Sequence, residues 1–332
     1  MRSSLVRSLV GTVALSLVLS NSPLTFAAAQ AQPGANTVDI PTQILRTGVN
    51  LSTTTLSANS SQLADQIGLM PVLSRIQQLK DSLASSRNDH TLENLEMRTS
   101  LQESINEARG ILLQAALEVD YVTAEIDAEK DVYSEILSSF TSSRDKLVAK
   151  ANATSFITNG FLWAVSEALA IPTNHHANYA VQAGTMGIIA GMVPSVASCY
   201  AMYAYGGKHK KSEADPNMLA KLFNYPTNNE VDYPNSVWAF LNAVPATESG
   251  KRTRKEQLVD RWIADSNMPG FTDRNSKKQL DTLTASAPVR RGLSIDTLSS
   301  RITMLQQLES EVAKMKRLLL ELSMAVNGSK KV

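Results

Sequence analysis

The chain has 332 residues, of which 43% are hydrophobic, 19% charged and 5% aromatic, and its formal net charge is +1. This length is enough for one large domain or two ordinary ones. The balanced charge and the few aromatic residues argue against a nucleic-acid-binding protein, which carries a basic excess or base-stacking side chains. Cys199 is the only cysteine, so the chain can form neither an intrachain disulfide nor a multi-cysteine metal site.

Residues 1–29 have the pattern of a bacterial signal peptide. Two arginines form a positive start, the apolar run "LVGTVALSLVL" follows over 9–19, and Ala27 and Ala29 provide small residues for cleavage. The apolar run is shorter than the roughly 20 residues that span a bilayer, which favours cleavage over an uncleaved signal anchor. We therefore expect an exported protein of the periplasm or cell envelope, with secretion as the alternative.

Residues 30–61 are rich in Ser, Thr, Asn, Gln and Ala, so they have little to bury and are expected to form a flexible linker. A helical pattern follows over 62–150. From 101 to 147, apolar residues alternate at spacings of four and three, and only Glu129 and Ser143 interrupt the series. A 3.5-residue period held over this length predicts a coiled coil or a long bundle helix.

Residues 151–207 form a charge-poor centre in which Glu167 is the only charged side chain. The polar sequence "IPTNHHAN" over 171–178 divides this stretch into two apolar halves. The second half, about 179–205, is long enough to cross a bilayer as a helix. The pattern predicts a helical hairpin that is prone to enter membranes.

Small residues recur at helical spacing in both halves of this hairpin, at Gly160, Ala164, Ala168, Ala180, Gly184, Gly187 and Gly191. Such stripes predict close packing of two helices, as in lipid. Glu167 lies beside the first stripe, and Tyr179 and Gln182 are its expected partners in a buried polar contact, with His175 or His176 as alternatives. This contact would either fix the helix register or act as a proton-linked switch, and we favour the register role.

Lysines flank the hairpin, and its turn has none. Lys146 and Lys150 precede it, while Lys208, Lys210 and Lys211 follow it. Solvated loops are the default interpretation of the lysines that follow, and contact with anionic lipid headgroups is the second. The charge placement fits a hairpin that enters a membrane from the exterior, with its uncharged turn crossing first. A hairpin buried in a bundle or an oligomer is the alternative.

Residues 208–290 are punctuated by prolines and are expected to hold short helices near 216–222, 236–243, 253–265 and 276–285. Residues 291–328 carry a second heptad pattern. Ser294 is the expected N-cap of this C-terminal helix, and Gly328 is its expected stop.

Together these segments predict a mainly α protein: an elongated coiled coil or helical bundle with a central apolar helical hairpin and a small irregular helical region. This order of segments is similar in outline to helical-bundle pore-forming toxins, which hold a hydrophobic segment between long helices until it inserts. The likeness is one of architecture, and no residue motif carries it.

No catalytic residue, cofactor site or metal site is predicted, because the four histidines and the single cysteine do not fall at ligand or nucleophile spacings. We therefore expect a non-enzymatic scaffold or assembly protein that acts through its heptad helices and its membrane-associated hairpin. Its expected partners are membrane lipid and either another protein or further copies of the chain, with no nucleic acid and no identified small-molecule substrate. The alternatives are a membrane-inserting effector and, less favoured, an exported enzyme with its site in 208–290.

Overall fold

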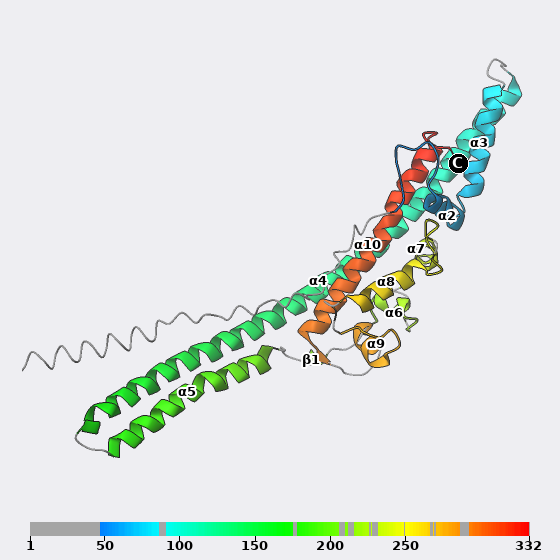
Figure 1. Ribbon diagram of the computed structural model, residues 1–332. Coiled ribbons are helices and arrows are strands. Elements are labelled where there is room, and N and C mark those ends of the chain that lie inside the picture. Colours follow the sequence, from blue (N-terminus) through cyan, green and yellow to red (C-terminus); the bar gives the residue numbers. More distant parts are fainter. Residues whose placement is uncertain are drawn as a thin grey trace, which may run out of the picture. The chain divides into compact units, whose positions relative to one another are not determined.

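The chain is mainly helical in the computed structural model (Figure 1). The helices in the described part of the chain are α2 (Ala58–Gln66), α3 (Met70–Ser85), α4 (Leu92–Ala170), the 3₁₀ turn η1 (Ile171–Asn174), α5 (Asn178–Tyr205), α6 (Leu219–Leu222), α7 (Asn235–Asn242), α8 (Arg254–Ala264), α9 (Lys277–Leu283) and α10 (Ile295–Val326). Two short strands, β1 (Lys210–Lys211) and β2 (Gly292–Leu293), pair antiparallel.

The structure describes residues 47–85, 91–174, 178–205, 210–211, 216–225, 227, 232–248, 250–265, 268, 270–285 and 292–331. The expected signal peptide, residues 1–29, lies outside these ranges. The same holds for His175 and His176, the alternative partners of Glu167, and for Lys208.

Helix α4 has 79 residues, which corresponds to about 120 Å at the helical rise of 1.5 Å per residue. Thr91 caps its start by accepting a hydrogen bond from the Asn94 amide at 3.3 Å. The predicted heptad positions are all buried or half-buried: Leu101, Ile105, Ala108, Leu112, Ala115, Val119, Val122, Ile126, Glu129, Tyr133, Ile136, Phe140, Ser143 and Leu147. The predicted long helix is therefore present, and the positions of its apolar period are shielded from solvent.

The helix continues without a break through residues 150 and 151, where the sequence placed the border between the heptad helices and the hairpin. No proline occurs between Thr91 and Pro172, so nothing in this stretch removes a backbone donor and ends the helix. The first half of the expected hairpin is consequently the end of α4 rather than a separate helix.

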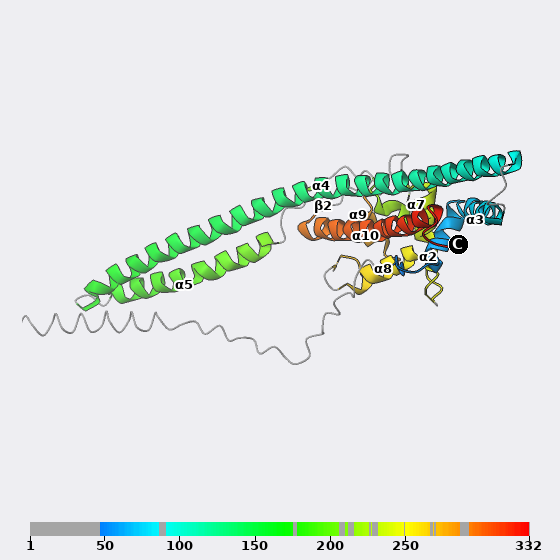
Figure 2. The same cartoon turned by 90° about the horizontal axis from the view of Figure 1, so that it is seen from above.

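Helix α10 runs antiparallel to the first half of α4, and both views show the two side by side (Figure 2). The order of two contacts fixes this direction. Lys130 pairs with Glu309 at 2.6 Å, and Arg109 donates to the side chain of Asn327 at 3.2 Å. Fully buried side chains fill the seam, among them Val119, Val122, Ile126, Leu305, Leu308 and Val312. Burial of each such side chain stabilises the fold by about 1.5–3 kcal/mol relative to its exposure.

A buried ion pair forms at the end of α10, and hydrogen bonds connect it to the start of α2. The side chains of Lys330 and Glu321 are both fully buried and lie 2.5 Å apart. The hydroxyls of Ser57 and Ser60 each donate to the Glu321 carboxylate at 2.6 Å. Burial alone would raise the pKa of Glu321, but the hydrogen bonds from Lys330, Ser57 and Ser60 outweigh burial and lower this pKa below its usual value. The Glu321 carboxylate is therefore stabilised in its ionised form, with hydrogen-bond partners on both sides.

The prediction of a flexible linker over 30–61 is wrong for residues 47–61. Helix α2 begins within it, and Thr55 forms a parallel bridge with Lys331. The Asn59 side chain is buried and donates to the Thr47 carbonyl at 2.9 Å. The polar composition misled the prediction, because these polar groups bond to the protein rather than to water.

Short helices α6 to α9 contribute to the same core as α4 and α10, with Phe240, Trp262 and Phe271 fully buried. Three of these helices lie within two residues of the predicted ranges. Helix α8 begins with a capping box between Thr253 and Glu256. Helix α6 has only four residues and begins at Leu219, three residues after the predicted start.

The expected ends of the C-terminal helix are confirmed. Ser294 accepts a hydrogen bond from the Thr297 amide at 3.1 Å, and Gly328 follows the helix with a φ of 84°, which favours glycine.

Candidate functional site

The last part of α4 and helix α5 form an antiparallel pair, which we call the α4–α5 arm. It consists of residues 147–170 of α4, η1 and α5 (Figure 1). The Ser166 hydroxyl donates to the Ala183 carbonyl at 2.8 Å, across the two helices. Because Ser166 is near the end of α4 and Ala183 near the start of α5, this contact lies close to the turn, at the tip of the arm.

Large apolar side chains of the arm are exposed. Phe156 is exposed to 82% and Phe161 to 68% of the full residue surface. The complete set is Phe156, Ile157, Phe161, Trp163, Ile171, Tyr179, Val181, Ile188, Ile189, Met192, Val196, Tyr200 and Tyr203. Among the described residues, Asn178–Ala201 is one stretch that is long and apolar enough to cross a membrane. Core helices of soluble proteins share this length and composition but are buried, whereas only 11% of this stretch's most apolar window is buried.

The predicted small-residue stripes do not form the helix contact. Gly187 alone lies at it, since a Cβ there would stand 3.5 Å from the Ser166 hydroxyl. The other members are exposed: Gly160, Ala164, Ala168, Ala180, Gly184 and Gly191. The buried positions of α5 are Ala183 and Ala190, each one residue before a predicted one. One residue turns a helix by about 100°, so the contact face and the small-residue face point in different directions.

Among the described residues, the predicted buried contact of Glu167 does not form either. The side chains of Glu167, Tyr179 and Gln182 are all exposed, and Ser166 provides the buried polar contact instead. Glu167 lies one residue beyond Ser166, so its side chain leaves the helix on another face. It stands three residues before the end of α4, close to the tip of the arm.

The predicted headgroup lysines follow the arm at its root. Lys210 and Lys211 form strand β1, which is paired with β2 immediately before α10. This pairing places their backbone beside the residues that precede α10. Their side chains lie outside the described part of the structure.

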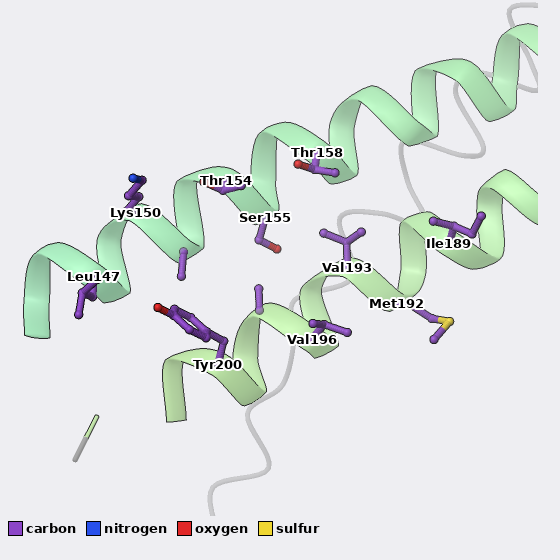
Figure 3. Close-up of a pocket in the computed structure, with 12 residues that line it drawn as sticks. Leu147, Lys150, Thr154, Ser155, Thr158, Ile189, Met192, Val193, Val196 and Tyr200 are labelled. Atoms are coloured by element: carbon purple, nitrogen blue, oxygen red, sulfur yellow. The ribbon is translucent and has the colours of Figure 1, made fainter. Parts of the chain in front are cut away.

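An open apolar groove of about 760 Å³ lies between the two helices near the root of the arm (Figure 3). Small side chains line much of it: Ala151, Thr154, Ser155 and Thr158 from α4, with Val193 and Ala197 from α5. None of the residues 141–165 is fully buried, whereas Ser166 and Ala183 near the tip, and Ala190 at the middle of α5, are buried. The arm is therefore closed by packing at its tip and open at its root.

A polar cluster around Glu129 of α4 contacts Met218, which follows β1 in the chain. The Met218 amide donates to the Glu129 carboxylate at 2.9 Å, and the Arg301 guanidinium lies over the Tyr133 ring at 5.2 Å from its centroid. Arg301 also donates to the Thr282 carbonyl. Burial raises the pKa of Glu129 to about 7, against the opposing effects of the Met218 hydrogen bond and the Arg301 charge.

Sequence reasoning found Glu129 only as an interruption of the heptad series and assigned it no role. The sequence signal that could have revealed its role is a charged residue at a seam position, because a buried charge needs a hydrogen-bonding or charged partner. A cleft of about 370 Å³ lies beside Glu129, Tyr133 and Arg301. Since Glu129 and Arg301 each bond a backbone group of a neighbouring segment, we interpret the cluster as an anchor for those segments.

No protein-family model, curated protein or solved structure matches the chain. Within the described ranges, no three His, Cys, Asp or Glu side chains gather closely enough to hold a metal ion. The features that call for a functional explanation are therefore the exposed apolar arm, the groove at its root and the buried cluster beside Glu129.

Proposed function

We propose that the protein is an exported, non-enzymatic protein of the bacterial cell envelope that binds a membrane with the α4–α5 arm. Exposed apolar side chains on both arm helices support this proposal most directly. Leaving a large apolar side chain in water costs about 1.5–3 kcal/mol relative to burying it. The arm exposes many of them, which is typical of a surface that is covered by lipid or a partner.

The dimensions of the arm fit a bilayer. Lys150 is the last charged residue before Glu167, and twenty residues separate it from the end of α4 at Ala170. At 1.5 Å per residue, this distance is about 30 Å, which equals the thickness of the hydrocarbon core. Helix α5 has 28 residues and no charged side chain, so it spans the same depth.

The exposure of Glu167 is consistent with this depth. Seventeen residues separate it from Lys150, which is about 25 Å along the helix. With Lys150 at one headgroup layer, Glu167 would lie close to the opposite one rather than at the bilayer centre. A carboxylate there avoids the cost of about 3 kcal/mol for a charge at mid-depth. The arm would then enter tip first, with Lys146 and Lys150 remaining at the surface.

The remaining helices would act as a scaffold outside the membrane. Helix α4 has a second set of apolar side chains, Leu113, Leu117 and Tyr121, which are exposed at four-residue spacing beside a groove of about 390 Å³. Such spacing suits a further helix, supplied by another protein or another copy of the chain. The heptad seam of α4 supports a coiled-coil or bundle arrangement for this part.

A charged substitution in the middle of the arm tests the membrane role. Phe161 lies eleven residues beyond Lys150, at about 16 Å and thus near mid-depth. Phe161→Glu should weaken insertion into vesicles about 100-fold, because a charge at the bilayer centre costs about 3 kcal/mol. Leu113→Glu is the matched control, since Leu113 is 62% exposed on the same helix outside the arm.

Vesicle flotation after an alkaline carbonate wash gives the readout for both variants. The proposal requires Leu113→Glu to float like the wild type while Phe161→Glu stays in the buffer. A wild-type protein that remains in the buffer would instead favour a protein partner for the arm. The pore-former alternative has no separate support, because the arm is exposed here rather than sheltered between long helices.

A further inference from the structure

The groove at the root of the arm differs from the rest of the arm surface because it is concave. Its volume of about 760 Å³ falls within the range of about 300–1,000 Å³ that is typical of small-molecule sites. It extends from Leu147 to Thr158 on α4 and from Ile189 to Tyr200 on α5, so it is about three helical turns long. A long, narrow and largely apolar groove suits a flexible hydrocarbon chain.

One cationic residue, Lys150, lies at the rim of this groove, and its ammonium end is directed away from α5 (Figure 3). No hydrogen bond or ion pair joins its ammonium group to another described residue. The Tyr200 ring is directed toward α4 across the groove (Figure 3). The hydroxyls of Thr154, Ser155 and Thr158 provide further polar groups on the α4 wall.

The depth of the arm in the bilayer relates the apolar groove to the position of Lys150. If the arm inserts as proposed, Lys150 lies at the headgroup layer and the groove runs from there toward the tip, alongside the acyl chains. We propose that the groove binds one acyl chain of an anionic phospholipid, with the lipid phosphate at Lys150. This inference rests on the proposed function, because insertion is what brings the groove and the lipid together. The bound chain would fill the space that the small side chains of both helices leave open.

Lysophosphatidylglycerol, used below its critical micelle concentration, is the probe, because it has one acyl chain and an anionic headgroup and forms no vesicle. Equilibrium dialysis with the full chain should show saturable binding of one lysolipid per chain. Shortening the lysolipid should lower its affinity about fourfold for each methylene removed. Lys150→Ala should weaken lysophosphatidylglycerol several-fold and leave zwitterionic lysophosphatidylcholine unchanged.

Filling the groove provides the decisive variant. Ala197→Trp places an indole between the helices and should weaken lysolipid binding at least tenfold. Ala168→Trp is the matched control, because Ala168 is exposed on the same arm outside the groove. Binding that does not saturate, or that is equal in the wild type and Ala197→Trp, would overturn the inference, as would a Lys150→Ala variant that keeps its preference for the anionic headgroup.

The same variants separate this site from the membrane role. Phe161→Glu should lose vesicle binding and keep lysolipid binding, since Phe161 does not line the groove. Ala197→Trp should lose lysolipid binding and keep vesicle binding. If vesicle binding fails in the wild type while saturable lysolipid binding persists, the proposed function is wrong and the groove site stands. If Ala197→Trp loses vesicle binding but binds lysolipid like the wild type, the groove site is wrong.

Discussion

Replacing Glu129 with glutamine tests the buried polar cluster that Glu129 forms with Tyr133 and Arg301. Burial, as the largest effect, raises the pKa of the Glu129 carboxyl from 4.5 to about 7. In the unfolded chain this carboxyl ionises near pH 4.5, so its ionisation disfavours folding increasingly from pH 4.5 to pH 7, and fully above pH 7. For these two pKa values, linkage gives a cost of about 1 kcal/mol at pH 5.5 and about 3 kcal/mol at pH 8.5.

Glutamine keeps an acceptor for the Met218 amide and carries no charge at either pH. The stability advantage of Glu129→Gln over the wild type should therefore grow by about 2 kcal/mol from pH 5.5 to pH 8.5. Urea unfolding followed by circular dichroism at both pH values measures this difference. Glu135→Gln, at an exposed position on the same helix, controls for the general loss of a negative charge. An advantage that is equal at both pH values, or a variant that is less stable at pH 8.5, would refute the reasoning.

Two further predictions concern packing. Lys330→Met leaves the Glu321 carboxylate buried without its cation, so the free energy of unfolding should fall by about 3–5 kcal/mol. Urea midpoints check this, and a loss below about 1 kcal/mol would contradict the buried pair. Gly187→Leu should push the arm helices apart because Gly187 faces Ser166 across the contact, whereas Gly191→Leu should be tolerated because a Cβ there meets no atom. Distances between spin labels on the two arm helices distinguish these outcomes, and equal distances in both variants would argue against the observed contact face.

The helical fold could largely be predicted because its signals are local. The 3.5-residue period located the seam of α4, and Ser294 and Gly328 located the ends of α10. Caps and apolar periods act within one or two turns, so the sequence alone reveals them. The position of the turn at 171–174 also followed from a local polar cluster that contains proline.

The contact face of the arm could not be predicted in the same way. Both helices are apolar nearly all round, so hydrophobic periodicity does not distinguish the inner face from the outer one. The small residues suggested Gly184 and Gly191, yet the buried positions are Ala183 and Ala190. The polar residues 47–61 posed the opposite problem, because their partners include Glu321 and Lys331, more than two hundred residues away. Only the tertiary structure brings such groups together.

Quenching of Trp163 by lipids with brominated acyl chains tests the membrane role of the arm most directly. Trp163 is exposed on the arm, thirteen residues beyond Lys150 and so about 20 Å into the bilayer if the arm enters tip first. The other two tryptophans, Trp238 and Trp262, lie outside the arm. Membrane insertion predicts that brominated vesicles quench the fluorescence of the wild type and that Trp163→Phe abolishes this quenching. Fluorescence that brominated lipids leave unchanged, or quenching that persists in Trp163→Phe, would contradict insertion of the arm.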